Sequence, residues 1–365
     1  MLSQKLRSFV VIVLFAALIF SVVTAEAQQK QPPRPKLKLA VSIYAGWMPW
    51  YYAADSGILK KWGDAQGVDI EVVRMDYIAS LEAYVAKKVD AVVATNMETL
   101  DLPAASGIDS TSIITGDFSN GNDAVLSRKG NNVCDLKGEE ISLVEGSVSH
   151  YLLVRALEKN GCKESDISIL NTSDADIAPA FISNRSQQAV VTWNPMVMQI
   201  REQVIGVKSL FTSADIPGEV LDLLVVRTDA LTKYPEFGRA LTGAWYEVMG
   251  IMTQRGTPER KTAIEQMAKA SGADVTAYEA QLKTTAMFYT PKSAVDYTAG
   301  AEIKNNMNTV RQFCFAHKLL GENTRSVDDI GIQYPDGSVQ GSKANIKFRF
   351  DNSFMQLAAL GKLKR

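Results

Sequence analysis

Residues 37–74 set the fold class, and they contain LKLAVSI at 37–43, PWYYAADSGILKKW at 49–62 and VDIEVVR at 68–74. The first and third segments are dominated by aliphatic and β-branched residues, which is typical of buried strands. The middle segment reads as a helix with proline in its first turn, where a missing N–H is tolerated. A strand, a helix and a second strand in this order predict a βαβ unit with two parallel strands.

The alternation of strands and helices continues after this unit. Further strands are expected at 90–95, 111–115, 124–128, 141–144, 167–170, 189–192 and 221–227, and helices at 78–87, 149–159, 175–183, 232–253 and 258–270. Because the βαβ pattern starts again at residue 141, we expect an α/β protein with two lobes. If the strand at 221–227 runs antiparallel beside 124–128, the chain crosses twice between the lobes in a two-strand hinge.

The last part of the chain carries a turn signal. Tyr334-Pro335-Asp336-Gly337, flanked by residues 330–332 and 344–350, predicts a late hairpin, and a helix is expected at 353–360. The expected division of the chain is a signal peptide at 1–27, a flexible lead-in at 28–36, lobe 1 at 37–125, lobe 2 at 126–220, a return to lobe 1 with C-terminal helices at 221–320, and a hairpin and helix strap at 321–365.

The first 27 residues have the pattern of a secretory signal peptide. Lys5 and Arg7 form a basic region, residues 9–23 are an almost unbroken apolar run, and Ala25-Glu26-Ala27 matches a signal-peptidase site. We expect cleavage after Ala27 and a soluble protein in the periplasm. A membrane anchor is the alternative, but the apolar run is shorter than the roughly 20 residues that span a bilayer.

The composition of the chain argues against several classes of function. The chain has 39 Lys+Arg against 40 Asp+Glu and no basic run, so a nucleic-acid partner is not expected. His150 and His317 are the only histidines of the 365 residues, which argues against a multi-histidine metal site and limits any Ser-His or Cys-His mechanism. We therefore expect no metal, no cofactor and no enzyme.

The three cysteines allow one disulfide after export. Cys134 precedes the strand at 141–144, and Cys162 follows the helix at 149–159. A strand and the helix that returns from it begin and end at the same edge of a sheet, so Cys134 and Cys162 are expected to pair and Cys314 to stay free. Three buried thiols are the open alternative.

Six short motifs follow one another along the chain: GWMPW at 46–50, GILK at 57–60, VDAV at 89–92, DLKG at 135–138, EGS at 145–147 and AVV at 189–191. Through these motifs the chain resembles the periplasmic solute-binding proteins of nitrate, sulfonate and taurine type ABC transporters. The resemblance covers residue 37 to about residue 289. TGDFSNGND at 115–123 and YPDGSV at 334–339 resemble the branch associated with urea carboxylase systems, which handle urea-like or guanidinium compounds. The resemblance implies a two-lobed type II periplasmic binding protein that closes on a small solute, acts as a monomer and delivers the solute to a membrane permease.

Five loops follow predicted strands at the edge where ligands of α/β sheets bind. They are residues 44–50, 96–98, 117–123, 145–150 and 193–195, and they hold four carboxylates and no Lys or Arg. Carboxylates and aromatic faces together favour a delocalised cation over an anion. The candidate ligand-binding residues are Tyr44, Trp47, Trp50, Asn96, Glu98, Asp117, Glu145, Ser147, Trp193 and Asn194, with Asp222 added from the hinge side; Asp123 is the fourth loop carboxylate and is expected to cap a turn.

The turn Glu145-Gly146-Ser147 opens a helix, whose free amides could hold an anion. We favour neutralisation of this helix end by Glu145 or by Ser147 as N-cap over a bound anionic substrate. His150 is expected to be structural, and a catalytic Ser147-His150 pair is weakly supported because an orienting carboxylate is not evident.

The sequence thus predicts the binding component of an ABC transporter for a small nitrogen-containing solute, with a guanidinium-type cation favoured over urea. A nitrate, sulfonate or taurine binder is the main alternative. A sensor lobe for a membrane receptor and a pyrimidine-precursor synthase-like enzyme on the same fold are further alternatives; the enzymes of that kind carry a cysteine-rich cluster, whereas the cysteines here are scattered.

Overall fold

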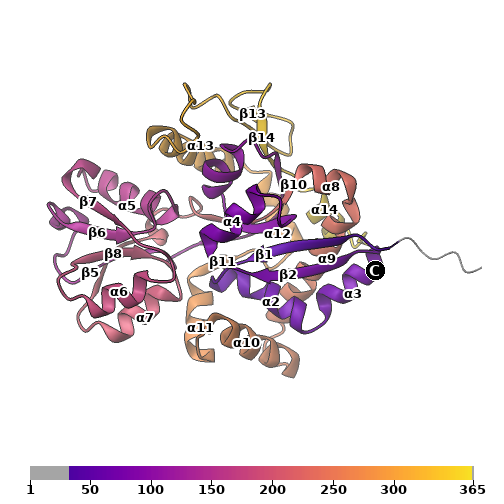
Figure 1. The fold of residues 1–365 in the computed structure, drawn as a ribbon. Coiled ribbons are helices and arrows are strands. Elements are labelled where there is room, and N and C mark those ends of the chain that lie inside the picture. The colour runs from indigo at the N-terminus through magenta and orange to yellow at the C-terminus, as the bar shows by residue number, and fades with distance from the viewer. Residues whose placement is uncertain (1–32, 364–365) are drawn as a thin grey trace, which may run out of the picture. The chain divides into compact units, whose positions relative to one another are not determined.

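The computed structural model describes residues 33–363. The expected signal peptide at 1–27 and most of the lead-in at 28–36 lie outside this range. The chain divides into Met1–Pro35 and Lys36–Arg365, and the second unit contains both sheets (Figure 1). Within residues 33–363, no helix combines the length and apolar character needed to cross a membrane.

The first sheet has nine strands. They are β1 (Lys36–Val41), β2 (Asp69–Arg74), β3 (Ala91–Thr95), β4 (Ser110–Ser119), β10 (Leu221–Arg227), β11 (Thr285–Met287), β12 (Gly331–Gln333), β13 (Val339–Gln340) and β14 (Ile346–Phe350). The order is β13-β12-β14-β4-β10-β3-β1-β2, and β11 pairs with β4. Strand β1 is parallel to both β2 and β3, as the βαβ pattern predicts.

Helices surround this sheet. They are α2 (Met48–Asp55), α3 (Ile58–Gln66), α4 (Tyr77–Val85), α8 (Thr228–Lys233), α9 (Pro235–Thr253), α10 (Pro258–Ser271), α11 (Val275–Lys283), α12 (Pro291–Thr298), α13 (Ala301–Ala316) and α14 (Ser353–Ala359), with short turns η1 (Ala45–Trp47) and η2 (Leu100–Ala104). Trp62 of α3 packs directly on Gly243 of α9, where a Cβ atom would collide with the indole ring. This close approach joins the early and late parts of the chain in one core.

The second sheet has five strands in the order β7-β6-β8-β5-β9. These are β5 (Ala124–Ser127), β6 (Glu140–Leu143), β7 (Ser168–Asn171), β8 (Ala189–Thr192) and β9 (Lys208–Thr212), with helices α5 (Val148–Lys159), α6 (Ile177–Ser183) and α7 (Met196–Gln203) and turns η3 (Val133–Leu136), η4 (Glu164–Asp166) and η5 (Ser213–Asp215). Two sheets flanked by helices confirm the predicted α/β class.

The expected hinge pairing is wrong. Strand β10 pairs antiparallel with β3 and β4 of the first sheet, whereas β5 lies between β8 and β9 of the second. Strand β10 is buried at six of its seven residues, which suits a central strand with neighbours on both sides. The chain still crosses between the sheets twice, after β4 and before β10.

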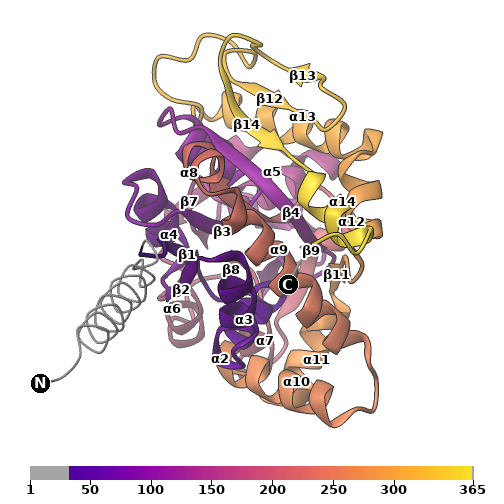
Figure 2. The same cartoon turned by 90° about the vertical axis from the view of Figure 1, so that its right-hand side faces the viewer.

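The C-terminal hairpin also differs from the prediction. Strand β12 forms its hairpin with the short β13, and the turn is closed by the Tyr334 N–H, which donates to the Ser338 carbonyl at 2.9 Å. Strand β14 instead runs parallel to β12 and pairs with β4 (Figure 2). The last segment therefore extends the first sheet, in keeping with the expected structural role.

A disulfide joins Cys134 and Cys162 in the second sheet region, with the two Cα atoms 5.8 Å apart. That separation lies in the ordinary range for disulfides. Cys314 is free and buried.

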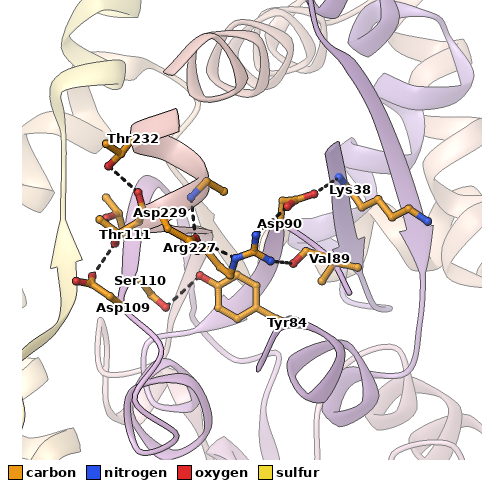
Figure 3. Close-up of polar contacts among 12 residues, drawn as sticks. Lys38, Tyr84, Val89, Asp90, Asp109, Ser110, Thr111, Arg227, Asp229 and Thr232 are labelled. Atoms are coloured by element: carbon orange, nitrogen blue, oxygen red, sulfur yellow. Dashed lines mark hydrogen bonds and ion pairs between the residues drawn. The ribbon is translucent and has the colours of Figure 1, made fainter. Parts of the chain in front are cut away.

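An ion-pair network holds the end of β10 that lies away from the crossover (Figure 3). The Arg227 guanidinium donates to the Val89 carbonyl at 2.8 Å and to Asp90 Oδ1 at 3.1 Å. Asp90 Oδ2 accepts from the Lys38 N–H at 2.9 Å, so one carboxylate ties β10 to β1. The network fixes the first sheet at the edge opposite the site described next.

Candidate functional site

Three polar residues lie side by side where the chain crosses between the sheets. Asp222, near the start of β10, is opposite Asp117 of β4 and opposite Thr95 at the end of β3. Asp117 was expected in a loop, but β4 continues to Ser119 and places Asp117 within a strand. The strand extends because its residues remain buried and pair with both β10 and β11.

Asp117 and Asp222 form a buried carboxyl pair. They are 0% and 3% exposed, and within the described residues no N–H or hydroxyl group donates to the Oδ2 atom of either. A hydrogen bond between the two carboxyl groups requires one of them to be protonated. Burial raises the pKa of Asp117 to about 7. Burial, and next the adjacent Asp117 charge, hold the pKa of Asp222 well above its ordinary value. Two such groups cannot both ionise cheaply without a positive partner.

Tyr44 and Gly46 shape the surroundings of Asp117. The Tyr44 hydroxyl donates to Asp117 Oδ1 at 3.3 Å and accepts from Asn122 Nδ2 at 3.2 Å. Gly46 lies against both side chains, and a Cβ atom at that position would come within 2.8 Å of Tyr44 Cε1 and would also collide with the Asp117 carboxylate. The glycine is needed here for this close approach.

Asp123 is a third buried carboxyl group. It is 3% exposed and accepts a hydrogen bond from the Ser119 hydroxyl. Burial raises its pKa to about 7. Asp123 therefore adds to the negative character of the site once it ionises.

Aromatic rings line the space beside these carboxyl groups. The ring centroids are 5.2 Å apart for Tyr44 and Trp47, 5.3 Å for Trp47 and Tyr77, and 6.0 Å for Tyr77 and Trp193. Trp50 stacks on Trp245 of α9 at 5.0 Å. The rings form a continuous apolar wall, typical of sites that bind flat or delocalised groups.

Two small cavities lie at this wall. One, of about 20 Å³, is lined by Tyr44, Trp47, Tyr77, Thr95, Asp123, Val148, Trp193, Val220 and Asp222. The other, of about 10 Å³, is lined by Trp47, Trp50, Val93, Ile114, Gly116, Asp117, Asp222, Leu223, Leu224 and Trp245. Trp47 and Asp222 border both cavities. Among the described residues that line them, there is no Lys or Arg.

Glu98 occupies the N-terminus of α5. The buried Glu98 carboxylate accepts the Val148 N–H at 2.8 Å and also a hydrogen bond from the Thr95 hydroxyl. Ser147 is the N-cap and accepts the Ser149 N–H at 3.1 Å. Glu98 and Ser147 therefore accept hydrogen bonds from N–H groups at this helix end, which agrees with the expectation that the chain itself caps the helix.

Other predicted site residues have different surroundings. Glu145 is exposed and lines neither cavity, because its turn faces away from the crossover. Asn96 accepts the Leu221 N–H at 3.0 Å and so fixes the start of β10. Asn194 donates to Asn122 Oδ1 at 2.7 Å and accepts the Met198 N–H at 3.1 Å. The expected cap role of Glu145 is wrong, and Glu98 fills it.

The two histidines of the chain lie together in the structure. Both contact Glu164 of η4, with Nε2–Oε distances of 2.6 Å for His150 and 2.8 Å for His317. The fold brings the end of α13 against α5, which no local sequence signal indicates. The Ser147 hydroxyl donates to the Val144 carbonyl at 2.7 Å, so it forms no catalytic pair with His150.

Several residues of the site were missed from the sequence, among them Tyr77, Asn122 and Trp245. Tyr77 starts α4 directly after a predicted strand, and the rule that ligands bind where strands end could have indicated it. Asn122 lies in a predicted loop, but its side-chain amide donates hydrogen bonds to Thr284 and Thr285, which are far along the chain. Trp245 comes from the middle of α9 and carries no signal in the sequence.

Comparison with known proteins places the chain in a family. Residues 47–250 match the family model described as NMT1/THI5 like. The chain is similar to the alkanesulfonate-binding protein SsuA of Xanthomonas axonopodis pv. citri bound to MOPS, at 19% identity and a TM-score of 0.65, over 80% of this chain and 96% of that one. It is also similar to the periplasmic aliphatic sulphonate binding protein SsuA of Escherichia coli, at 19% identity and a TM-score of 0.64, over 80% and 89%.

A Brucella abortus protein named only as a binding protein is 27% identical over 166 residues, which are 45% of this chain and 50% of that protein. The chain thus spans about half the length of the curated relatives it matches. The solved structures share the two-sheet fold of periplasmic binding proteins with this chain. The match over residues 47–250, which include Trp47, Asp117, Asp222 and Trp245, shows that the chain belongs to the NMT1/THI5-like family.

Proposed function

We propose that this protein is the solute-binding component of an ABC import system and that its solute is a small planar cation of the guanidinium type. The observation that carries the proposal is the buried Asp117–Asp222 carboxyl pair, to whose two Oδ2 atoms no N–H or hydroxyl group of the described residues donates. Such a pair is costly unless a ligand brings positive charge and hydrogen-bond donors.

Guanidinium meets both requirements. It carries a delocalised positive charge and N–H groups that pair with carboxylate oxygens in parallel. Its flat faces can stack on an aromatic ring, and Trp47 borders both cavities beside Asp222. Urea offers similar N–H donors but no charge, so it gains less from ionised Asp117 and Asp222.

The size of the site supports a small solute. The two cavities measure about 20 and 10 Å³, and a space of roughly 10–15 Å³ holds one water molecule. Spaces of this size favour a solute of few non-hydrogen atoms over an alkanesulfonate.

The electrostatics argue against an anion. The similar solved structures are named for alkanesulfonate and sulphonate binding. In this chain, the Val148 N–H at the start of α5 donates to Glu98 and is therefore not available to an anion. An anion in the cavities would also face Asp117, Asp123 and Asp222. Like charges in a buried site repel strongly.

The family and the fold support the transport role, with a membrane permease as the partner and a monomer as the acting form. Export to the periplasm follows from the sequence pattern at residues 1–27. A Ser-His enzyme is disfavoured because Ser147 and His150 have separate hydrogen-bond partners.

The proposal is tested by calorimetric titration of the purified protein with guanidinium, urea, taurine, nitrate and alkanesulfonates. We expect guanidinium to bind more tightly than urea and the anions to give no heat of binding. Tight binding of any of the anions contradicts the proposal, as does urea binding more tightly than guanidinium.

A further inference from the structure

Both histidines of the chain and one glutamate meet at a single point away from the solute cavities. His150 lies in the first turn of α5, Glu164 in η4, and His317 directly after α13. The Nε2 atoms of His150 and His317 are 2.6 and 2.8 Å from separate oxygens of Glu164, and the two imidazole centroids are 4.9 Å apart. Their potential ligand atoms all lie within 4.8 Å of one another.

The His317 ring is oriented as a metal-binding imidazole usually is. Its Nδ1 atom faces the Phe313 carbonyl at 3.0 Å, so an Nδ1–H donor leaves the Nε2 lone pair directed at the cluster. The Phe313 ring packs against both imidazoles, with centroids 4.1 Å from His317 and 5.5 Å from His150. These contacts fix both rings before any ion binds.

His150 can also act as a metal ligand after a small change in its hydrogen bonds. Its Nδ1 atom accepts the Gly146 N–H at 3.3 Å, which is long for a hydrogen bond. Binding of a metal at Nε2 gives up this contact and moves the proton away from Nε2. The loss is modest because the Gly146 bond is weak at that length.

The cluster is accessible on one side. The side chain of His150 is 6% exposed, whereas His317 and Glu164 are 20% and 33% exposed. An ion can therefore enter from solvent, and one coordination position remains open to water. A buried structural ion pair would not need two imidazoles directed at the same carboxylate.

We propose that His150, Glu164 and His317 form a binding site for a divalent transition-metal ion of the zinc type, with water as the fourth ligand. Two imidazole nitrogens and one carboxylate oxygen are a preferred ligand set of Zn²⁺. The set is unsuited to Mg²⁺ and Ca²⁺, which prefer oxygen ligands throughout.

The site also bridges the two sheet regions. His150 and Glu164 belong to the part built around the five-stranded sheet. His317 follows α13, which contacts the C-terminal part of the first sheet through Lys304, whose ammonium pairs with Asp336 at 2.6 Å and whose carbonyl accepts from Gln340 Nε2 at 2.8 Å. A bound ion would therefore hold the two regions together.

The test is a Zn²⁺ titration of the full chain, as processed by its host and carrying no polyhistidine tag, by calorimetry. We expect one equivalent of bound Zn²⁺, no binding of Mg²⁺, and a visible absorption band when Co²⁺ replaces Zn²⁺. Because the sequence has only two histidines, no other imidazole can account for the signal.

Variants assign the ion to the cluster. We expect Glu164→Gln and His317→Gln each to lower the Zn²⁺ affinity about tenfold or more, while Glu145→Gln, a change at an exposed carboxylate near α5, leaves it unchanged. Circular dichroism of each variant checks that the fold is kept. Failure of the natural chain to bind Zn²⁺, or binding that survives both substitutions combined, overturns the proposal.

Discussion

At the scale of single residues, Asp117 is the most informative side chain. It lies near the end of β4, its pKa is raised to about 7 by burial, and no N–H or hydroxyl group of the described residues donates to its Oδ2 atom. We predict that Asp117→Asn lowers guanidinium affinity by about 1.5–3 kcal/mol, the usual cost of losing a charged hydrogen bond. Calorimetry measures this, and the exposed Glu145→Gln is the matched control. An unchanged affinity in the Asp117 variant would remove this residue from the site.

Solute binding should depend on pH through the same carboxyl groups. Burial raises the pKa of Asp117 and Asp123 to about 7, so below this pH both are largely protonated in the ligand-free chain. A cation favours the ionised forms, and its affinity should therefore rise as the pH increases through about 7; ionisation of Asp222, whose pKa burial also raises, adds to this rise. Titrations in buffers of different ionisation enthalpy should also show proton release. A flat affinity between about pH 6 and pH 8 would contradict this linkage.

The free energy of unfolding of the ligand-free chain should instead fall as the pH increases. Asp residues in an unfolded chain have a pKa near 4, so between about pH 4 and pH 7 the folded chain binds more protons than the unfolded chain. The contribution of Asp117 and Asp123 to the free energy of unfolding is therefore full below this window and is lost as the pH rises through it. Denaturant unfolding at several pH values measures the slope. Asp117→Asn should make it shallower, and a slope unaffected by this change would count against the raised pKa.

The residue types of the site could be predicted from the sequence, but only some of their positions could be. Tyr44, Trp47 and Asp117 followed from the rule that ligands bind where strands end, since all three lie at that edge. Glu145 satisfied the same rule and is exposed, because the direction of a side chain within a turn is set by contacts between segments. Trp245 depends on how α9 packs behind Trp50, which is a tertiary contact that no local pattern encodes.

At the scale of elements, the start of α5 supports the proposed preference for a cation over an anion. Glu98 from the first sheet caps a helix of the second, and its carboxylate accepts the Val148 N–H at 2.8 Å. We predict that Glu98→Gln, which keeps the shape and removes the charge, lowers the free energy of unfolding by about 0.5–2 kcal/mol, as expected for a charge at a helix N-terminus. Thermal unfolding measures the change. Glu140→Gln, an exposed position on β6, is the control, and equal effects in both variants would refute the special role of Glu98.

The elements themselves were largely predictable, and their pairing was not. The strands at 37–43, 68–74 and 90–95 appear as β1, β2 and β3 because their aliphatic and β-branched residues suit strands, with β1 and β3 largely buried and β2 at the edge of the sheet. The partner of β10 was mistaken because its apolar residues suit either sheet. Register and neighbours are set by the two crossovers, which depend on side-chain packing over long sequence distances.

At the scale of the whole molecule, the Arg227 network should contribute to stability and not to solute binding. It lies at the end of β10 opposite Asp222 and ties β10 to Val89 and Asp90. We predict that Arg227→Gln lowers the free energy of unfolding by about 1.5–3 kcal/mol and leaves guanidinium affinity unchanged. Lys60→Gln, which removes an exposed ion pair with Asp64, should cost far less. A loss of solute affinity in the Arg227 variant with its fold intact would show that the two ends of the sheet are coupled.

The strand pairing around Asp117 also shows how much of the chain the carboxyl site requires. Asp117 lies on β4 and its neighbour Asp222 on β10, about a hundred residues later. On the other side of β4, Asp117 pairs with Met287 of β11, whereas β14 pairs with β4 only at Ser110 to Ser112, away from Asp117. Both members of the carboxyl pair therefore exist only once residue 222 has been made, and the strand around Asp117 has neighbours on both sides only after residue 287.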